Sequence, residues 1–377
     1  AHFGFTGAWE NSGVIVIPED LLPADGRFGS GPAKVRPEAL EYLSLRGDVL
    51  GTSHRQAPVK QLVATIQEGL QELYQLPEGY QVVLGNGGST VFWDVAVCSL
   101  IERRSAHAVF GEFTRKFARA AAAAPFLADP AITQCDPGAV VLPAQEDADV
   151  VAWAQNETST GAAAPVERIG DGLVLIDATS AAGGMAADIS RTDVYYFAPQ
   201  KNFSSDGGLW VAFCSPAALE RAGRIAASGR WIPESLNLDV AASNSAKNQT
   251  LNTPAIATLL LLEDQINWLL DLGGIDAAEE RCRRMSDHLY GWAEASSYAT
   301  PFVTDPAHRS PVVATIDLVP GVDATRVIAE LRRNGIVDVD PYRALKRNQL
   351  RIGTYASVDQ ADVEALTACI DHVVARL

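Results

Sequence analysis

Apolar positions along the chain follow two different periods, which predicts an ordered series of helices and strands. Residues 37–45 and 59–74 have the helical spacing, and the second of these segments closes before Pro77. Short apolar runs typical of strands lie at residues 81–84, 108–110, 150–152, 173–176, 194–197 and 209–213. Helical and loop segments separate most of these runs. Alternation of this kind predicts an α/β fold, in which helices cover a parallel or mixed sheet.

The later part of the chain predicts a second, smaller unit. Thr253-Pro254 has the pattern of an N-cap followed by proline at the first helical position, and Gly273-Gly274 has the pattern of a helix end. A long polar helix at 277–296 leads into a βαβα tail at 312–317, 324–334, 350–353 and 359–376. We therefore expect an N-terminal arm at 1–26, a large domain at 27–270 and a small C-terminal domain at 271–377.

Composition narrows the class of protein. A chain of 377 residues suits two domains, and its formal net charge of −16 argues against nucleic-acid binding, which needs a basic patch. The five cysteines contain no C-x-x-C pair and the six histidines lack ligand spacing, so we expect no disulfide framework and no metal site. The start lacks the pattern of a secretory signal, and Glu263 and Asp264 interrupt the most apolar stretch. We expect a cytoplasmic protein without a membrane span.

The strongest chemical signal is a lysine that follows an apolar run. Residues 194–197 lead into a polar, glycine-containing loop that carries Lys201, and a second apolar run leads away. A lysine among aromatic and small residues at a strand end can be partly desolvated. Its pKa then falls and the neutral amine can attack an aldehyde. Taken alone, the segment also fits a surface lysine in a hairpin loop.

An acid ends the apolar run that lies about 24 residues before this lysine. Asp177 is at the carboxyl end of its predicted strand, where open α/β sheets bind ligands. A carboxylate suits the pyridine nitrogen of pyridoxal 5'-phosphate (PLP), because the protonated ring is the electron sink of that cofactor. A helix cap or an ordinary strand-end aspartate is the alternative for Asp177 alone.

A glycine-rich turn, Gly85-Asn-Gly-Gly, precedes Ser89-Thr90, which we expect to cap a helix that runs to about residue 102. Free backbone N–H groups at the start of a helix, aligned with its dipole, can bind a phosphate. The turn matches neither the G-x-G-x-x-G pattern nor the Walker pattern, which contains a lysine. The phosphate cradle, the aspartate and the lysine, in this order, together point to PLP.

With these residues in place, the sequence resembles the phosphoserine aminotransferases, which are class-V, fold-type I PLP enzymes, and most of all their actinobacterial-type branch. The resemblance runs from about residue 28 to the C-terminus. It rests on four motifs: Gly29-Ser-Gly-Pro-Ala-Lys, Gly51-Thr-Ser-His-Arg, Ala198-Pro-Gln-Lys-Asn and Asn252-Thr-Pro. It implies a large domain with a mainly parallel sheet sandwiched by helices, a smaller C-terminal α+β domain, and a homodimer with shared active sites.

The resemblance also implies roles for particular residues. Lys201 matches the lysine that bonds to the cofactor aldehyde and then acts as general base, and Asp177 matches the partner of the pyridine nitrogen. Phe113 matches the aromatic residue that stacks on the ring, and Thr158 the threonine near the ring hydroxyl. The positions that match contacts to the cofactor phosphate are Gly88, Ser89 and Gln200, with Asn252 and Thr253 from the other subunit.

The activity that the resemblance implies is reversible amino transfer from L-glutamate to 3-phosphohydroxypyruvate, giving O-phospho-L-serine and 2-oxoglutarate in serine biosynthesis. Recognition of the substrate carboxylate and phosphate would fall to His54, Arg55 and Arg351, because the arginine fork binds either group in a bidentate way. The chain departs from the family pattern at Ser89, where many members have an arginine, and at Pro341-Tyr-Arg, near a usual His-Arg pair. Further candidates for the substrate phosphate are Arg343, Lys346 and Arg347.

Other interpretations keep or change the class of protein. An alanine–glyoxylate or serine–pyruvate type aminotransferase, or a cysteine desulfurase relative, would have the same fold and cofactor. Arg55 favours an anionic substrate group, and no cysteine lies in an obvious glycine-flanked loop. A Rossmann-type dehydrogenase would need G-x-G-x-x-G after its first strand, which is not found. A non-catalytic binding module has no need of Lys201 together with Asp177.

Overall fold

The computed structural model describes residues 14–144 and 147–377, and its larger sheet has seven strands. The strands follow the order β1 (Gln81–Gly87), β9 (Gly208–Cys214), β8 (Val194–Phe197), β7 (Leu173–Asp177), β4 (Val150–Ala154), β2 (Ser105–Val109) and β3 (Ala131–Gln134). The strands from β8 to β3 pair in parallel, and β9 runs antiparallel to both of its neighbours. The sheet is therefore mixed but mainly parallel.

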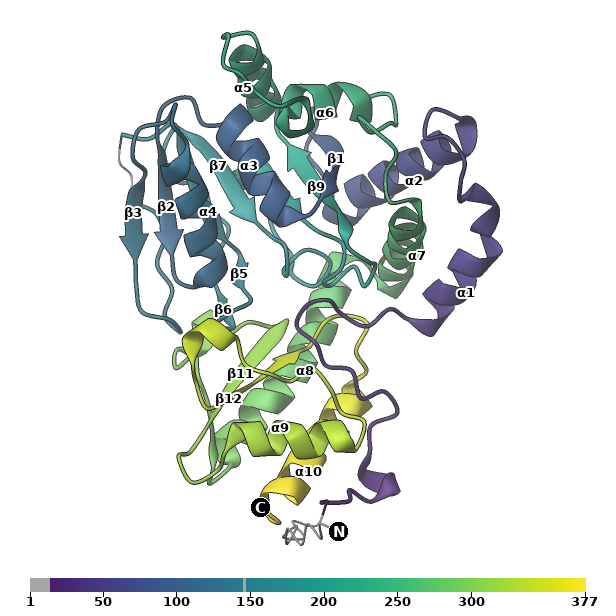
Figure 1. The fold of residues 1–377 in the computed structure, drawn as a ribbon, viewed down its shortest axis with the longest axis vertical. Helices are drawn as coiled ribbons and strands as arrows, with labels where there is room; N and C mark the ends of the chain where they lie inside the picture. The colour runs from purple at the N-terminus through teal and green to yellow at the C-terminus, as the bar shows by residue number, and fades with distance from the viewer. Residues whose placement is uncertain (1–13, 145–146) are drawn as a thin grey trace, which may run out of the picture.

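Helices cover both faces of this sheet, which explains why its central strands are continuous apolar runs (Figure 1). On one face, α2 (Ala57–Tyr74) and α7 (Ile256–Leu272) contribute to a core that contains Tyr195 and Phe197. On the other face, a separate core contains Tyr196 and residues of four helices. These helices are α3 (Ser89–Ser99), α4 (Glu112–Ala123), α5 (Pro216–Ala226) and α6 (Leu238–Ser245).

The C-terminal part has its own sheet and its own core. The antiparallel strands β10 (Ala299–Pro301), β11 (Val313–Leu318) and β12 (Gln349–Gly353) pack with three helices. These are α8 (Ile275–Ala295), α9 (Ala324–Arg333) and α10 (Gln360–Val374). Ile17 and Phe28 belong to the same core, so the first described residues pack on the C-terminal part. The short α1 (Pro37–Leu45) packs on α7, and β5 (Asn156–Glu157) pairs with β6 (Ala162–Ala163).

The predicted α/β architecture is confirmed, whereas two predicted helix starts are wrong. The helix after the glycine-rich turn begins at Ser89 with Gly88 as its N-cap, because β1 continues through the turn to Gly87. The later helix begins at Ile256 instead of after Thr253. Asn86 Nδ2 donates to the Thr253 carbonyl, which holds Thr253 outside the helix.

The division into an arm, a large domain and a small domain at residues 26 and 270 stays a prediction. Residues 1–13 of the predicted arm lie outside the described residues. Among the helices that the structure describes, none combines the length and the apolar composition that a bilayer crossing requires.

Candidate active site

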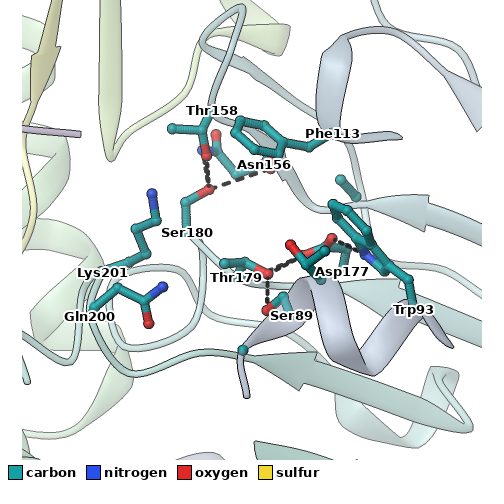
Figure 2. Close-up of a pocket in the computed structure, with 13 residues that line it drawn as sticks. Ser89, Trp93, Phe113, Asn156, Thr158, Asp177, Thr179, Ser180, Gln200 and Lys201 are labelled. Carbon is teal, nitrogen blue, oxygen red and sulfur yellow. Dashed lines mark hydrogen bonds between the residues drawn. The ribbon is translucent and has the colours of Figure 1, made fainter. Parts of the chain in front are cut away.

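A pocket opens where the carboxyl ends of β4 and β7 meet the start of α3 and the turn after β8 (Figure 2). It encloses about 640 Å³ of empty space, its open mouth included. The lining residues are Gly88, Ser89, Thr90, Trp93, Phe113, Ala154, Asn156, Thr158, Asp177, Thr179, Ser180, Gln200 and Lys201. The pocket therefore brings together seven of the residues predicted from the sequence: Lys201, Asp177, Gly88, Ser89, Phe113, Thr158 and Gln200.

Lys201 follows the buried strand β8 and points into the pocket. Its Nζ donates a hydrogen bond of 3.0 Å to the carbonyl oxygen of Ser30, and the Tyr355 hydroxyl donates to the same oxygen at 2.6 Å. Burial, with a smaller contribution from the positive charge of Arg351, lowers the pKa of Lys201 to about 8. The neutral, nucleophilic amine is therefore accessible near neutral pH.

Gly31 explains why the Gly29-Ser-Gly-Pro motif lies beside this lysine. A Cβ atom at position 31 would be 1.6 Å from Lys201 Nζ, and the φ of Gly31 is +153°. Any side chain would displace the amine, so a backbone without Cβ is required here. The N-terminal motif is thus a wall of the lysine site.

Asp177 ends β7 and is buried at the opposite side of the pocket from Lys201. Its Oδ1 accepts hydrogen bonds from Thr179 N at 2.9 Å and Thr179 Oγ1 at 2.5 Å, and its Oδ2 accepts one from Trp93 Nε1 at 3.2 Å. Burial raises the pKa of Asp177, and the hydrogen bonds from Thr179 and Trp93 oppose that rise. A cationic group in the pocket would stabilise the buried carboxylate further.

The start of α3 forms the side of the pocket below Asp177. Gly88, Ser89 and Thr90 line it, and a Cβ atom added at Gly88 would meet nothing within 4 Å. The Ser89 hydroxyl lies 2.6 Å from Thr179 Oγ1, which places the Ser89 side chain against the Asp177 network. We call Ser89, Trp93, Asp177 and Thr179 the pocket floor. Free N–H groups at this helix start suit a phosphate.

Phe113 and Thr158 approach the pocket from the opposite direction (Figure 2). Phe113 is in the first turn of α4, and the buried Glu157 carboxylate accepts the backbone N–H groups of Phe113 and Thr114 at 3.3 and 2.9 Å. Burial raises the pKa of Glu157, and these hydrogen bonds oppose the rise. Thr158 Oγ1 donates to Ser180 Oγ at 2.7 Å. Glu157 thus fixes the turn that carries Phe113.

Arg351, in β12, is a half-buried cation beside the pocket wall. Its Nη1 donates to the Thr158 carbonyl at 3.3 Å, and its Nε is buried without a partner among the described residues. Burial lowers the pKa of Arg351. Its guanidinium lies 5.4 Å from the ring centre of Tyr342, and Lys116 Nζ is 3.4 Å from the Tyr342 hydroxyl. An unpaired guanidinium at this place can bind an anionic substrate group.

Four predicted residues lie together outside the pocket lining. His54 Nδ1 is 3.3 Å from Thr253 Oγ1, and Asn86 Nδ2 donates to Asn252 Oδ1 at 2.5 Å. Arg55 Nη1 donates to Gln249 at 2.9 Å. Burial and the charge of Arg55 lower the pKa of His54, whose Nε2 has no partner in the described part of the chain. We call His54, Arg55, Asn252 and Thr253 the outer cluster.

The remaining phosphate candidates differ in their surroundings. Arg343 and Lys346 are exposed near the Tyr342 ring, and neither forms an ion pair within the described ranges. Arg347 is paired with Asp317 and lies over the Phe302 ring. The Arg347 guanidinium is therefore already engaged by Asp317 and Phe302, which makes Arg347 a weaker candidate for the substrate phosphate than Arg343 or Lys346.

Sequence reasoning missed several residues of the site: Ser30, Trp93, Asn156, Thr179 and Ser180. Thr179 lies two positions after Asp177, so an aspartate followed by a hydroxyl residue was a usable local pattern. Trp93 could not be found in this way, because its contact with Asp177 depends on how α3 packs on the sheet.

The residues that surround the pocket fit PLP. A nucleophilic lysine, a buried carboxylate and a helix start with free N–H groups surround one space, as the aldehyde, ring nitrogen and phosphate of PLP require. Two buried polar atoms of the lining, Asn156 Oδ1 and Gln200 Oε1, have no partner among the described residues. A polar ligand would supply these partners. In the described residues, no group of three or more side chains suited to a metal ion was found.

Comparisons with known proteins give the family. Residues 134–366 match the model described as Aminotransferase class-V. The phosphoserine aminotransferase of a Nocardioides species is 58% identical over 371 residues, which are 97% of this chain and 99% of the relative. The structure of a phosphoserine aminotransferase from Cytophaga hutchinsonii aligns with a TM-score of 0.85 at 21% identity, covering 92% of this chain and 99% of that chain.

The alanine–glyoxylate aminotransferase of a Nostoc species also has this fold. Its TM-score is 0.78 at 20% identity, with 93% of this chain and 96% of that chain covered. Similarity at this level shows the fold alone, so the sequence identity to the curated relative decides between the two kinds of aminotransferase. The chain therefore belongs to the phosphoserine aminotransferases, within the class-V aminotransferase family, and is a PLP-dependent enzyme.

Proposed function

We propose that this chain transfers the amino group of L-glutamate to 3-phosphohydroxypyruvate and releases O-phospho-L-serine and 2-oxoglutarate. The observation that carries the proposal is that Lys201, whose pKa is lowered, shares one pocket with the buried Asp177 and lies close enough to Arg351 for the arginine charge to act on its amine. This arrangement combines the groups needed for PLP chemistry with a cation for the substrate. The 58% identity to a phosphoserine aminotransferase supports the choice of substrate.

Bound PLP would supply an aldehyde that joins reversibly to amines and a ring that accepts the electron pair released when a Cα–H bond breaks. Lys201 would hold the cofactor through Nζ and, once its amine is free, move the proton from the substrate Cα. A pKa of about 8 suits both tasks, because the amine exchanges its proton easily near neutral pH. Asp177 would hold the proton of the ring nitrogen in place.

The other lining residues would orient the cofactor. Phe113 would cover the ring, Thr158 would lie near the ring hydroxyl, and the phosphate would be bound by Gly88, Ser89 and Gln200. For Ser89 we expect the backbone N–H to be the phosphate ligand, because its hydroxyl is engaged with Thr179. Arg351 would bind the substrate carboxylate, and the exposed Arg343 and Lys346 would attract the substrate phosphate.

We further propose that the active site is completed by a second copy of the chain. The outer cluster lies outside the lining of its own pocket, and its polar groups His54 Nε2 and the neighbouring Asn86 Oδ1 lack partners in the described structure. Three exposed leucines precede the cluster in sequence: Leu40 is 52% exposed, Leu45 82% and Leu50 46%. Exposed apolar side chains and unpartnered polar groups are both typical of an interface.

We propose a cytoplasmic location. All five cysteines are unpaired, and three of them are buried. Unpaired cysteines of this kind fit a reducing compartment.

The visible spectrum of the purified protein tests the proposed activity. With PLP bound, the protein should be yellow, and O-phospho-L-serine and L-glutamate should each bleach the colour, whereas L-alanine should not. Bleaching by L-alanine but not by O-phospho-L-serine would overturn the substrate and favour an alanine–glyoxylate type enzyme. Failure of added PLP to colour the protein would overturn the whole proposal.

A further inference from the structure

Tyr196 is a fully buried tyrosine whose hydroxyl has no hydrogen-bond partner among the residues that the structure describes. It is the Cα partner of Asp177 in the parallel pairing of β8 with β7. Residues paired in this way project from the same face of a sheet. The phenol and the carboxylate therefore lie side by side.

Aromatic side chains of α3 and α4 hold the Tyr196 ring. The Phe92 ring stacks on it at 4.4 Å between centroids, and the Phe117 ring meets it edge-on at 6.3 Å. The polar groups close enough to affect the pKa of the hydroxyl are the Trp93 indole and the Asp177 carboxylate. By distance and angle, neither completes a hydrogen bond with the hydroxyl among the described residues. Burial and the charge of Asp177 raise the pKa of Tyr196 well above its ordinary value, so the phenol keeps its proton.

The adjacent Tyr195 differs from Tyr196 in the hydrogen bonding of its hydroxyl. It belongs to the core on the other face of the sheet, and its hydroxyl donates to Gln155 Oε1 at 2.7 Å. Two consecutive tyrosines are thus equally buried on opposite faces of the sheet, but only the Tyr195 hydroxyl has a hydrogen-bond partner among the described residues. A buried hydroxyl without a partner costs stability and calls for an explanation. A partner that is engaged only when the cofactor is bound would provide one.

The number of hydrogen bonds that Asp177 can accept shows when the Tyr196 hydroxyl would gain a partner. Oδ1 accepts two hydrogen bonds from Thr179, and Oδ2 accepts the indole N–H of Trp93. A carboxylate has about four lone-pair positions. The ring nitrogen of PLP would take the fourth, so a further donor can bind Asp177 only if Trp93 gives up its position.

We propose that Tyr196 is a positioning residue for Asp177, acting as a hydrogen-bond link between Trp93 and the carboxylate when the cofactor is bound. The indole N–H would donate to the phenol oxygen, and the phenol O–H to Asp177. Such a bond keeps the carboxylate ionised, which leaves the proton on the ring nitrogen. The proposal rests on the proposed placement of the PLP ring nitrogen at Asp177.

The test compares the binding of PLP with that of 1-deazapyridoxal phosphate, in which carbon replaces the ring nitrogen. The ratio of the two dissociation constants reports the interaction at Asp177 separately from the lysine and phosphate contacts. For Tyr196→Phe we expect this preference for PLP to fall about tenfold, the effect of one hydrogen bond to a charged group. Tyr195→Phe is the matched control and should keep the preference. The melting temperatures of the cofactor-free variants complete the test.

The results distinguish a failure of the role proposed for Tyr196 from a failure of the proposed placement of the ring nitrogen at Asp177. Because the Tyr196 hydroxyl has no hydrogen-bond partner in the described part of the cofactor-free chain, Tyr196→Phe should melt no lower than the unchanged protein, whereas Tyr195→Phe should melt lower. An unchanged preference for PLP in Tyr196→Phe, or an equal loss in both variants, would overturn the role of Tyr196. Asp177→Asn should abolish the preference. If it does not, the placement of the ring nitrogen itself is wrong.

Discussion

The pocket floor and the outer cluster contain similar polar side chains in opposite situations. On the floor, Asp177 is buried and receives three hydrogen bonds from Thr179 and Trp93 of the same chain. In the outer cluster, Arg55, Asn252 and Thr253 are exposed, and the partly buried His54 leaves Nε2 unpaired. The floor is therefore organised before any ligand arrives, whereas the outer cluster is organised only if another surface covers it.

Replacing Lys201 should have the largest effect, because we propose that this one amine holds the cofactor and moves the proton. We expect Lys201→Ala to lower kcat by ~10⁴-fold or more while the protein stays folded. Glutamate-dependent turnover and the circular dichroism spectrum are the measurements. Clear transamination by Lys201→Ala would overturn the proposal that Lys201 is the reactive amine of this pocket.

The outer cluster can be tested by mixing two inactive variants. We expect Arg55→Ala alone to lower kcat/KM by about 10²-fold, because a charged contact to the substrate is lost. If Arg55 serves the site of the second subunit, a heterodimer of Arg55→Ala and Lys201→Ala contains one intact site. Random mixing should then restore about a quarter of the unchanged activity. No recovery in a mixture shown to contain heterodimers would place Arg55 in the site of its own chain.

Arg351 contacts the Thr158 carbonyl beside the pocket and should show an intermediate effect. We expect Arg351→Met to raise KM for the amino-acid substrate by roughly 10- to 100-fold with a smaller change in kcat, because the proposed contact of its guanidinium with the substrate carboxylate is lost. Initial rates at varied L-glutamate provide the measurement. A change in kcat alone, at constant KM, would contradict a role in binding.

The same variant tests whether the positive charge of Arg351 lowers the pKa of Lys201. Only the neutral amine of Lys201 attacks an aldehyde, so the rate of PLP binding to the cofactor-free protein should rise with pH and level off above about 8. Arg351 lowers the pKa of Lys201, so Arg351→Met should move this midpoint to higher pH. Stopped-flow absorbance across pH 6–10 would detect the shift. A midpoint that moves to lower pH would contradict the assigned cause.

Ser89 should show the smallest effect. Its hydroxyl contacts Thr179, and the backbone N–H at the start of α3 is what we expect to bind the phosphate. Ser89→Ala keeps that N–H, so the dissociation constant for PLP should rise by less than about threefold. Equilibrium titration with PLP measures this. A much larger loss would mean that the hydroxyl itself contacts the cofactor.

The two regions also differ in how far the sequence could predict them. Lys201 and Asp177 each follow an apolar run, so local periodicity was sufficient to place both at strand ends. Trp93 and Tyr196 were not predictable, because their positions beside Asp177 depend on helix packing and on strand register. Ser89 and Thr253 were wrongly taken as helix caps, since hydroxyl residues near a helix start resemble caps whether or not they serve as such.

The outer cluster was assembled only through resemblance to a family. No periodicity links His54 to Thr253, and their contact joins residues 199 positions apart. The seven-stranded order was equally out of reach, because an alternation of strands and helices does not specify which strands are neighbours.

The contacts of Ser30 have a consequence for how the protein is made. Its carbonyl oxygen receives both the Lys201 amine and the hydroxyl of Tyr355, and Ser30 and Tyr355 are 325 residues apart in the chain. During synthesis the N-terminal wall of the site leaves the ribosome well before Tyr355 does. The surroundings of the lysine therefore stay incomplete while the chain between Ser30 and Tyr355 is synthesised, so the wall that emerges first has to wait for the residue that completes it.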